Sequence, residues 1–378
     1  MGFYLDNAAT TPVRREAAEA AMETMLELWG NPSARYDLGT EMTQRLRGWR
    51  DDMAYAIGCL PEEVIFTSCG TESDSWAIRA AAQLGRHTGK HIITTAIEHS
   101  AVLNPCRELE QQGYEVTYLK PDHTGNISIE DLKAALRPDT ILVSMMLVNN
   151  ELGTILPVAQ AAKAIKAAHC PALFHCDAVQ GFLKVPFTPK ELGVDFLSIS
   201  GHKIHAPKGI GVMYCRKGVK LPPMLLGGGQ EGGLRSGTEP TSQIAALAAA
   251  ARLGRDSLEA DLKHMAELKE YAISELARIP GVRVLTQGGA PHILPITLTG
   301  YKSEVVVRFL NDRGVYVSAG SACHKGKPSH VYAALKLPKK EQDGVLRVSF
   351  FYDTTREDVD ALVLGLKAAR EQLFTSLS

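Results

Sequence analysis

The sequence has 378 residues, 45% of them hydrophobic and 22% charged, a length that allows two domains or one large one. The net charge of −1 excludes a global field that would attract nucleic acid or an anionic membrane surface. The N-terminus lacks the apolar run of a secretory signal, and no apolar stretch reaches the ~18 residues of a membrane helix. With seven cysteines that lack paired spacing, these features predict a cytoplasmic protein without disulfides, membrane contact or direct nucleic-acid contact.

Short β-rich segments alternate with amphipathic helical segments between residues 63 and 216. The predicted strands are Val64–Thr67, His91–Ala96, Val116–Leu119, Ile141–Leu147, Leu173–Cys176, Phe196–Ile199 and Gly211–Tyr214. The predicted helices are Trp76–Leu84, Leu103–Gln112, Ile129–Leu136 and Val158–Ala168. The apolar runs are too continuous to alternate, which indicates strands buried on both faces by covering helices. This order of elements predicts an α/β layer architecture.

A Gly/Pro-rich segment, Leu221–Pro240, ends the alternation, and long helical segments follow to about Ile279. Further strands are predicted at Val282–Leu285, Ile293–Leu298, Val315–Ser318 and Leu346–Phe350, and helices at Glu304–Asn311 and Glu357–Phe374. This C-terminal third is interpreted as a smaller α+β domain whose boundary lies near residues 250–260, inside a helix.

The segment Ser200-Gly201-His202-Lys203 directly follows a predicted strand. A lysine in a polar turn at a strand end lies where α/β sheets hold their ligands. Its neutral amine can form a Schiff base with an aldehyde cofactor, and burial favours that neutral form. The alternative is a solvated surface lysine, and Lys208 in the next turn competes for the same role.

Asp177 also ends an apolar strand. Chemistry with pyridoxal 5′-phosphate (PLP) needs a carboxylate on the pyridine nitrogen, so that the protonated ring can take up carbanion charge. Taken alone, Asp177 would be read as a helix cap. Followed by the strand-end Lys203, it becomes a PLP signature.

Small and polar residues, Cys69-Gly70-Thr71-Glu72-Ser73, join a predicted strand to a helix. The exposed N–H groups and positive dipole end of a helix N-terminus suit a phosphate group. The competing interpretation is a plain helix cap formed by Thr71 or Ser73.

Cys323 lies in a small, basic segment with His324, Lys325 and Lys327. Neighbouring cations stabilise a thiolate, so this segment predicts a reactive cysteine, the alternative being an ordinary free thiol. Cys323, His324 and His330 would lack a fourth ligand, and no metal site is predicted.

With these residues assembled, the chain resembles the cysteine desulfurases of the class-V aminotransferase group, in their NifS/IscS-like branch. The matching motifs are Tyr4–Pro12, Gly30–Tyr36, Phe66–Ser73, Glu98–Val102, Val148–Thr154, Asp177–Gln180, Ser200–Gly211, Arg235–Pro240, Ser318–Cys323 and Leu346–Phe350. They run in order nearly from end to end. The chain departs from the branch at Tyr36, where His is usual, at Cys69-Gly70, and in a Cys323 segment about two residues shorter than in iron–sulfur-dedicated enzymes.

The resemblance implies a fold-type-I PLP enzyme, with a mainly parallel seven-stranded sheet between helices and a smaller α+β C-terminal domain. It assigns residues 13–255 to a large PLP-binding domain, and residues 1–12 and 256–378 to a small domain carrying the cysteine segment. It also implies a homodimer with active sites at the subunit interface.

The resemblance also implies a role for each site residue. Lys203 would hold PLP, Asp177 the pyridine nitrogen and Gln180 the ring hydroxyl, while His99 would stack on the ring and serve as an acid or base. The phosphate would be held by Gly70, Thr71, Ser200, His202 and, from the partner subunit, Thr238. Asn150 and Arg347 would bind the substrate carboxylate.

The implied reaction converts L-cysteine to L-alanine. Lys203 moves the α-proton, and the Cys323 thiolate takes the substrate sulfur as a persulfide, which then passes to an acceptor protein for iron–sulfur cluster assembly or for tRNA or cofactor thiolation. The alternatives are a selenocysteine lyase or another PLP enzyme of this family, or a non-catalytic sulfur-relay protein that kept the fold.

Overall fold

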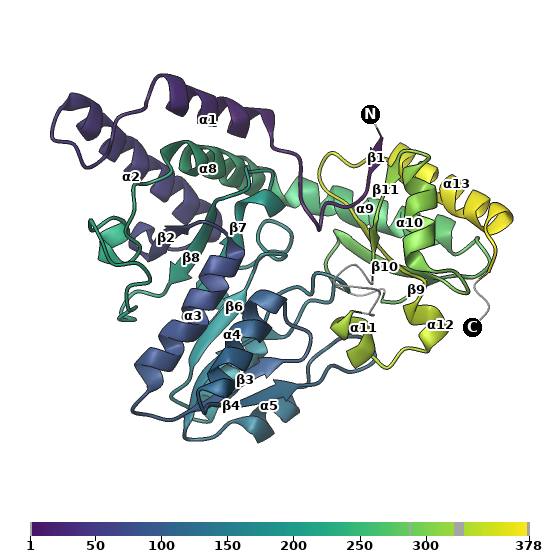
Figure 1. The fold of residues 1–378 in the computed structure, drawn as a ribbon, viewed down its shortest axis with the longest axis horizontal. Coiled ribbons are helices and arrows are strands. Elements are labelled where there is room, and N and C mark those ends of the chain that lie inside the picture. Colours follow the sequence, from purple (N-terminus) through teal and green to yellow (C-terminus); the bar gives the residue numbers. More distant parts are fainter. Residues whose placement is uncertain (1, 287–288, 321–328, 376–378) are drawn as a thin grey trace.

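A computed structural model describes residues 2–286, 289–320 and 329–375. The chain forms two unequal halves, and helix α9 (Leu258–Leu276) extends from the larger toward the smaller (Figure 1). The helices of the described ranges are too short or too polar to cross a lipid bilayer.

The larger half is built on a seven-stranded sheet with strand order β2-β8-β7-β6-β5-β3-β4. Its strands are β2 (Val64–Thr67), β3 (His91–Thr95), β4 (Glu115–Leu119), β5 (Thr140–Ser144), β6 (Leu173–Asp177), β7 (Phe196–Ser200) and β8 (Gly211–Cys215). Only β8 runs antiparallel to its neighbours, so the sheet is mainly parallel. Strands β2, β3, β5, β7 and β8 are buried along their whole length, as the continuous apolar runs predict.

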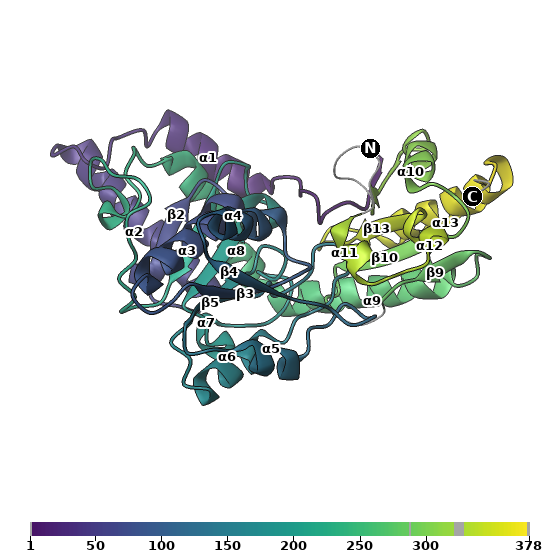
Figure 2. The same cartoon turned by 60° about the horizontal axis from the view of Figure 1, so that its bottom comes forward.

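Helices cover both faces of this sheet. They are α1 (Arg15–Leu26), α2 (Asp37–Ile57), α3 (Gly70–Gly85), α4 (Ser100–Gln111), α5 (Ile129–Ala135), α6 (Val158–Ala167), α7 (Pro189–Leu192) and α8 (Thr241–Asp256). Helices α3 and α4 lie on one face and α5 and α6 on the other (Figure 2). Helices α1 and α2 both pack on α8. The α/β architecture is therefore confirmed.

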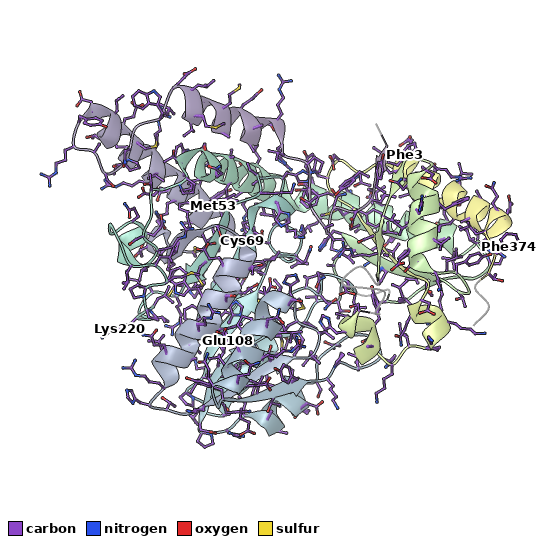
Figure 3. All side chains as sticks on the ribbon, in the orientation of Figure 1. Phe3, Met53, Cys69, Glu108, Lys220 and Phe374 are labelled. Atoms are coloured by element: carbon purple, nitrogen blue, oxygen red, sulfur yellow. The ribbon has the colours of Figure 1, made fainter. Side chains whose placement is uncertain are left out.

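The smaller half has a four-stranded antiparallel sheet of order β12-β13-β10-β9. Its strands are β9 (Val282–Val284), β10 (Ile293–Leu298), β12 (Ser318–Ala319) and β13 (Val345–Ser349), and its other helices are α10 (Ser303–Asn311), α11 (His330–Ala334), α12 (Lys339–Gln342) and α13 (Arg356–Gln372). The N-terminus joins it, because β1 (Phe3–Tyr4) pairs with β11 (Val315–Tyr316). Phe3 and Phe374 accordingly lie in the same half of the molecule (Figure 3).

The structure corrects two predicted elements. Helix α3 begins at Gly70, six residues before the predicted Trp76, because its first turn is polar and carries no amphipathic signal. The predicted strand Val315–Ser318 is two strands, since β11 pairs with β1 and β12 pairs with β13. Helices α1 and α2, which the sequence pattern did not reveal, carry many exposed apolar side chains that blur their amphipathic pattern.

Candidate active site

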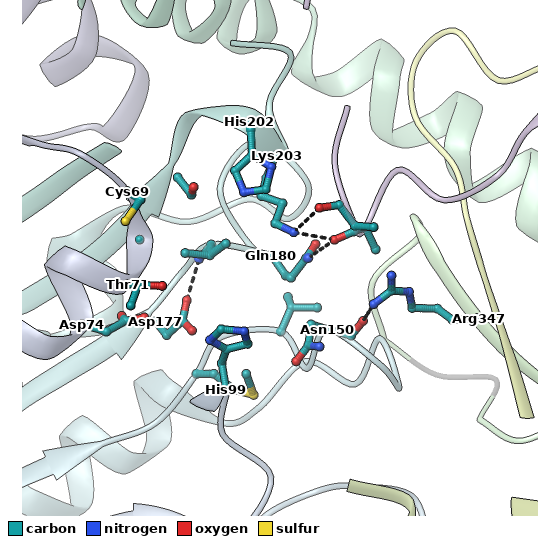
Figure 4. A pocket seen from close by; sticks show the side chains of 17 residues that line it. Cys69, Thr71, Asp74, His99, Asn150, Asp177, Gln180, His202, Lys203 and Arg347 are labelled. Atoms are coloured by element: carbon teal, nitrogen blue, oxygen red, sulfur yellow. Dashed lines mark hydrogen bonds between the residues drawn. The ribbon is translucent and has the colours of Figure 1, made fainter. Parts of the chain in front are cut away.

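The carboxyl ends of four parallel strands meet at one edge of the large sheet, together with the loop that leads from β5 to residue 150. They surround a cavity of about 340 Å³ (Figure 4). Its walls are formed by Ala8, Ala9, Cys69, Gly70, Thr71, Asp74, His99, Met146, Val148, Asn150, Asp177, Val179, Gln180, Ser200, His202, Lys203 and Arg347. A switch in strand order at the carboxyl edge is where open α/β sheets bind ligands.

Lys203 enters the cavity from the short turn that follows β7. Its Nζ donates hydrogen bonds to the carbonyl oxygens of Ala8, at 2.8 Å, and Ala9, at 2.7 Å. Burial and the nearby Arg347 guanidinium lower the pKa of Lys203 to about 8. A large fraction of the amine is therefore neutral near pH 8, the form in which nitrogen is a nucleophile.

Asp177 ends β6 and accepts a hydrogen bond from the Val179 backbone N–H at 2.9 Å. Burial, together with the neighbouring Asp74, raises the pKa of Asp177 above its ordinary value. Asp74 Oδ1 lies 3.4 Å from His175 Nε2, but burial lowers the pKa of that imidazole to about 4. Because His175 is neutral, the buried carboxyl groups of Asp74 and Asp177 have no imidazolium beside them to balance their negative charge. A ligand that places a positive charge next to Asp177 would therefore be favoured.

The first turn of α3 forms a close-fitting wall. Its N-cap residue is Cys69, whose side chain makes no capping hydrogen bond, so the competing interpretation of a helix cap by Thr71 or Ser73 does not apply. A Cβ atom added to Gly70 would lie 2.6 Å from Val179 Cγ2 and 3.4 Å from Ser200 Cβ. The backbone N–H groups of this turn and the positive end of the helix dipole therefore suit an anion.

His99 and Gln180 both line the cavity (Figure 4). His99 caps α4, and its Nδ1 accepts a hydrogen bond from Ala101 N at 3.1 Å, which leaves any proton of the neutral ring on Nε2. Gln180 Nε2 donates to Ala8 O at 2.8 Å, while its Oε1 accepts a 3.3 Å hydrogen bond from the fully buried Lys184. The His99 ring and the Gln180 amide are thus each fixed in orientation by local partners.

Arg347 reaches the far end of the cavity from β13 (Figure 4). Its guanidinium donates to Asn150 O at 3.0 Å and to Asp6 Oδ1 at 2.9 Å. Its Nε is buried and has no hydrogen-bond partner among the described residues. A planar carboxylate is the ligand that such a guanidinium prefers.

Ten of the twelve residues singled out in the sequence line this one cavity. Thr238 is exposed and does not line it, Lys208 is exposed as well, and Cys323 lies outside the described residues. Sequence reasoning missed Asp74, which lies four residues after Gly70 on the same face of α3. It also missed Lys184, which lies four residues after Gln180 on the same side of the turn. It also missed Glu151, next to Asn150.

Comparison with known proteins gives a consistent result. The class-V aminotransferase model matches residues 3–362. The cysteine desulfurase IscS of Methanosarcina thermophila is 42% identical over 95% of this chain and 90% of its own length. The solved structure of a NifS-like protein superposes with a TM-score of 0.93 at 35% identity, covering 99% of this chain and all of that one. The structure of SspA in complex with cysteine gives a TM-score of 0.81 at 33% identity, over 92% and 98% of the two chains.

These matches extend over nearly the full length of the chain, and they agree with the geometry of the cavity. Asp177 and Lys203 lie there at the ends of the neighbouring strands β6 and β7. The chain belongs to the class-V aminotransferase family of PLP-dependent enzymes, in its NifS/IscS-like cysteine desulfurase branch.

Proposed function

We propose that the protein is a PLP-dependent cysteine desulfurase that converts L-cysteine to L-alanine and passes the sulfur to Cys323 and then to an acceptor protein. The observation that supports this most is Lys203, which shares one cavity with Asp177 and whose pKa is lowered to about 8. The identity of about 42% to a cysteine desulfurase over nearly the whole chain supports the choice of substrate.

The cavity residues fit PLP. A protonated pyridine nitrogen beside Asp177 would supply the positive charge that neutral His175 does not. The first turn of α3, with Gly70, Thr71, Ser200 and His202, would hold the phosphate, and Gln180 and His99 would contact the ring. When bound, PLP supplies an electron sink for negative charge at the substrate α-carbon.

The protein's own groups would carry the protons and the sulfur. Lys203 would hold the cofactor and move the α-proton through Nζ, and His99 would exchange protons through Nε2. Arg347 and Asn150 would bind the substrate carboxylate. Transfer of one sulfur atom from cysteine to the Cys323 thiol gives alanine and a persulfide, so the step needs no external oxidant.

Gly70→Ala is expected to weaken PLP binding about tenfold, because the new methyl group must displace Val179 or Ser200 from a packed site. Titration of the apoprotein with PLP, followed by absorbance, measures this. Gly48→Ala is the matched control, since a Cβ atom there has no neighbour within 4 Å. Equal PLP affinity in wild type and Gly70→Ala would contradict the assigned phosphate site.

We further propose a homodimer in which Thr238 completes the partner's phosphate site. The segment before Thr238 is held by two ion pairs: Arg235 binds Glu72 at the start of α3, and Glu231 binds Arg50 of α2. Helix α1 and the residues after it expose Met22, Met25, Leu26 and Trp29 by 53–69%, an apolar face suited to burial by a second copy.

Mixed dimers test this arrangement. Lys203→Ala and Thr238→Ala chains, each expected to be impaired alone, should regain activity when refolded together, because one site per mixed dimer would combine an intact Lys203 with the other chain's Thr238. Sedimentation should show a dimer throughout. A fully active monomer, or no gain on mixing, would refute the shared site.

Three finer assignments accompany this proposal. The division into residues 13–255 and residues 1–12 with 256–378 stays a prediction, as does action in the cytoplasm, although the six described cysteines are all free. The acceptor serves iron–sulfur cluster assembly or thiolation of tRNA or a cofactor.

Comparing kcat/KM for L-cysteine and L-selenocysteine, with alanine as the product measured, tests the proposed reaction. A strong preference for selenocysteine would favour the lyase alternative instead.

A further inference from the structure

Helix α11 follows directly on residues 321–328, the segment that contains Cys323, and Gly320 precedes that segment. Both flanking points, Gly320 and Ser329, are described by the structure. They line a second cavity, of about 510 Å³, which shares His99, Asn150 and Arg347 with the candidate active site.

The C-terminal flank is fixed to the larger half of the molecule by three hydrogen bonds. Ser329 Oγ donates to Glu151 Oε1 at 2.8 Å, and Tyr332 OH donates to the Glu151 carbonyl oxygen at 3.2 Å. His330 Nε2 lies 3.0 Å from the carbonyl oxygen of Glu98, the residue before His99. Ser329 Oγ also accepts from Val331 N at 3.1 Å and so caps α11. The three contacts with Glu151 and Glu98 therefore join Ser329 and α11 to loops that carry the candidate active-site residues Asn150 and His99.

The N-terminal flank meets the same tyrosine. Gly320 donates its N–H to Val345 O at 2.8 Å, and a Cβ atom at Gly320 would lie 2.8 Å from Tyr332 Cε2. Tyr332 is 1% exposed, so its ring is packed between this flank and Glu151. Both ends of the segment thus lie beside one residue pair, Glu151 and Tyr332.

Glu151 itself is held rigidly. Its backbone N–H donates to Asn149 Oδ1 at 3.0 Å, and Asn149 Nδ2 donates to Ile97 O at 2.8 Å, which ties the turn to the His99 loop. The preceding carbonyl, of Asn150, accepts the Arg347 hydrogen bond. Burial raises the pKa of Glu151 to about 7, and its Oε2 has no hydrogen-bond partner among the described residues. A buried carboxyl group with an unpaired oxygen lowers the stability of the fold, so its presence indicates a role other than stabilisation.

We propose that Glu151 is a positioning residue for sulfur transfer: its hydrogen bonds to Ser329 and Tyr332 fix Ser329 and α11, the part of the chain that follows Cys323, against the loop that carries Asn150. The inference rests on the proposed function, since it assumes that Cys323 receives the sulfur. Glu151 acts through Ser329, and no direct contact with the reacting atoms is assigned to it.

The test measures persulfide formation in a single turnover with L-cysteine, on the PLP-loaded dimer. Glu151→Ala and Ser329→Ala should each slow Cys323 persulfide formation tenfold to hundredfold, since misplacement by about 1 Å costs up to ~100-fold. PLP affinity should change less than about twofold, because neither residue lines the cofactor cavity. Glu151→Gln should restore most of the rate, because its amide oxygen can still accept from Ser329.

The double variant separates positioning from general damage. If the two side chains act through one hydrogen bond, Glu151→Ala with Ser329→Ala should be no slower than the slower single variant. Ser128→Ala, which removes the equivalent N-cap of the distant helix α5, is the matched control and should leave the rate unchanged.

Multiplicative effects of the two substitutions, an unchanged persulfide rate, or a parallel loss of PLP affinity would each overturn the proposal. Failure of the proposed function is distinguishable from these outcomes, because the wild-type protein itself would then place no persulfide on Cys323.

Discussion

Lys203→Ala is expected to lower alanine production from L-cysteine by about 10²–10⁴-fold, the usual contribution of a positioned proton-transfer group. The variant also loses the covalent hold on PLP, so borohydride treatment should label wild type at Lys203 and leave the variant unlabelled. Peptide mapping after reduction identifies the labelled lysine. The exposed Lys208, which lies outside the cavity, provides the control, and Lys208→Ala should react as wild type does.

The pKa of Lys203 adds a pH dependence to the same prediction. Because burial and Arg347 lower this pKa to about 8, the neutral amine becomes the major form above pH 8. Capture of PLP by the apoprotein should therefore accelerate as pH rises toward 8 and level off above it. Capture that continued to accelerate up to pH 10, the range of an unperturbed lysine, or a borohydride label on Lys208, would contradict the assignment.

Cys323→Ala is expected to abolish persulfide formation and to lower alanine production by at least about 100-fold, while PLP and L-cysteine still bind. Without this thiolate the substrate sulfur has no acceptor, so the reaction should stop before the carbon–sulfur bond is broken. Absorbance changes on adding L-cysteine measure binding, and quantified alanine measures turnover.

Cys59→Ala is the matched control for this variant. Burial raises the pKa of the Cys59 thiol to about 12, so that sulfur stays protonated and unreactive at neutral pH. Cys59 also lies outside the candidate active site. Undiminished alanine production by Cys323→Ala would overturn the proposed sulfur route, whereas loss of activity in both variants would indicate general damage.

The fold could be predicted where a buried segment shows a recognisable apolar pattern in the sequence. Strands of the large sheet that helices cover on both faces appear as continuous apolar runs, and the run at Phe196–Ile199 is one example. Helix α3 was predicted too short because its first turn is polar and carries no amphipathic signal. The division between β11 and β12 at Val317 was missed because a change of pairing partner leaves no periodic signal.

The candidate site was predictable where chemistry needs a particular side chain at a strand end, as for Lys203 and Asp177. The carbonyl oxygens of Ala8 and Ala9 were not predictable, because a backbone acceptor places no demand on residue type. These two lie 195 and 194 residues from Lys203 in the chain. Glu151 was missed for a related reason: its partners Ser329 and Tyr332 come from the other half of the molecule, and only the tertiary fold brings them together.

The most direct test of the account is a brief exposure of the PLP-loaded protein to L-cysteine, without reductant or acceptor. Alanine is quantified, and every cysteine is mapped by alkylation and mass spectrometry. The account predicts alanine and persulfide in equal amounts, with the persulfide on Cys323. Alanine without persulfide, persulfide on another of the seven cysteines, or pyruvate in place of alanine would contradict it.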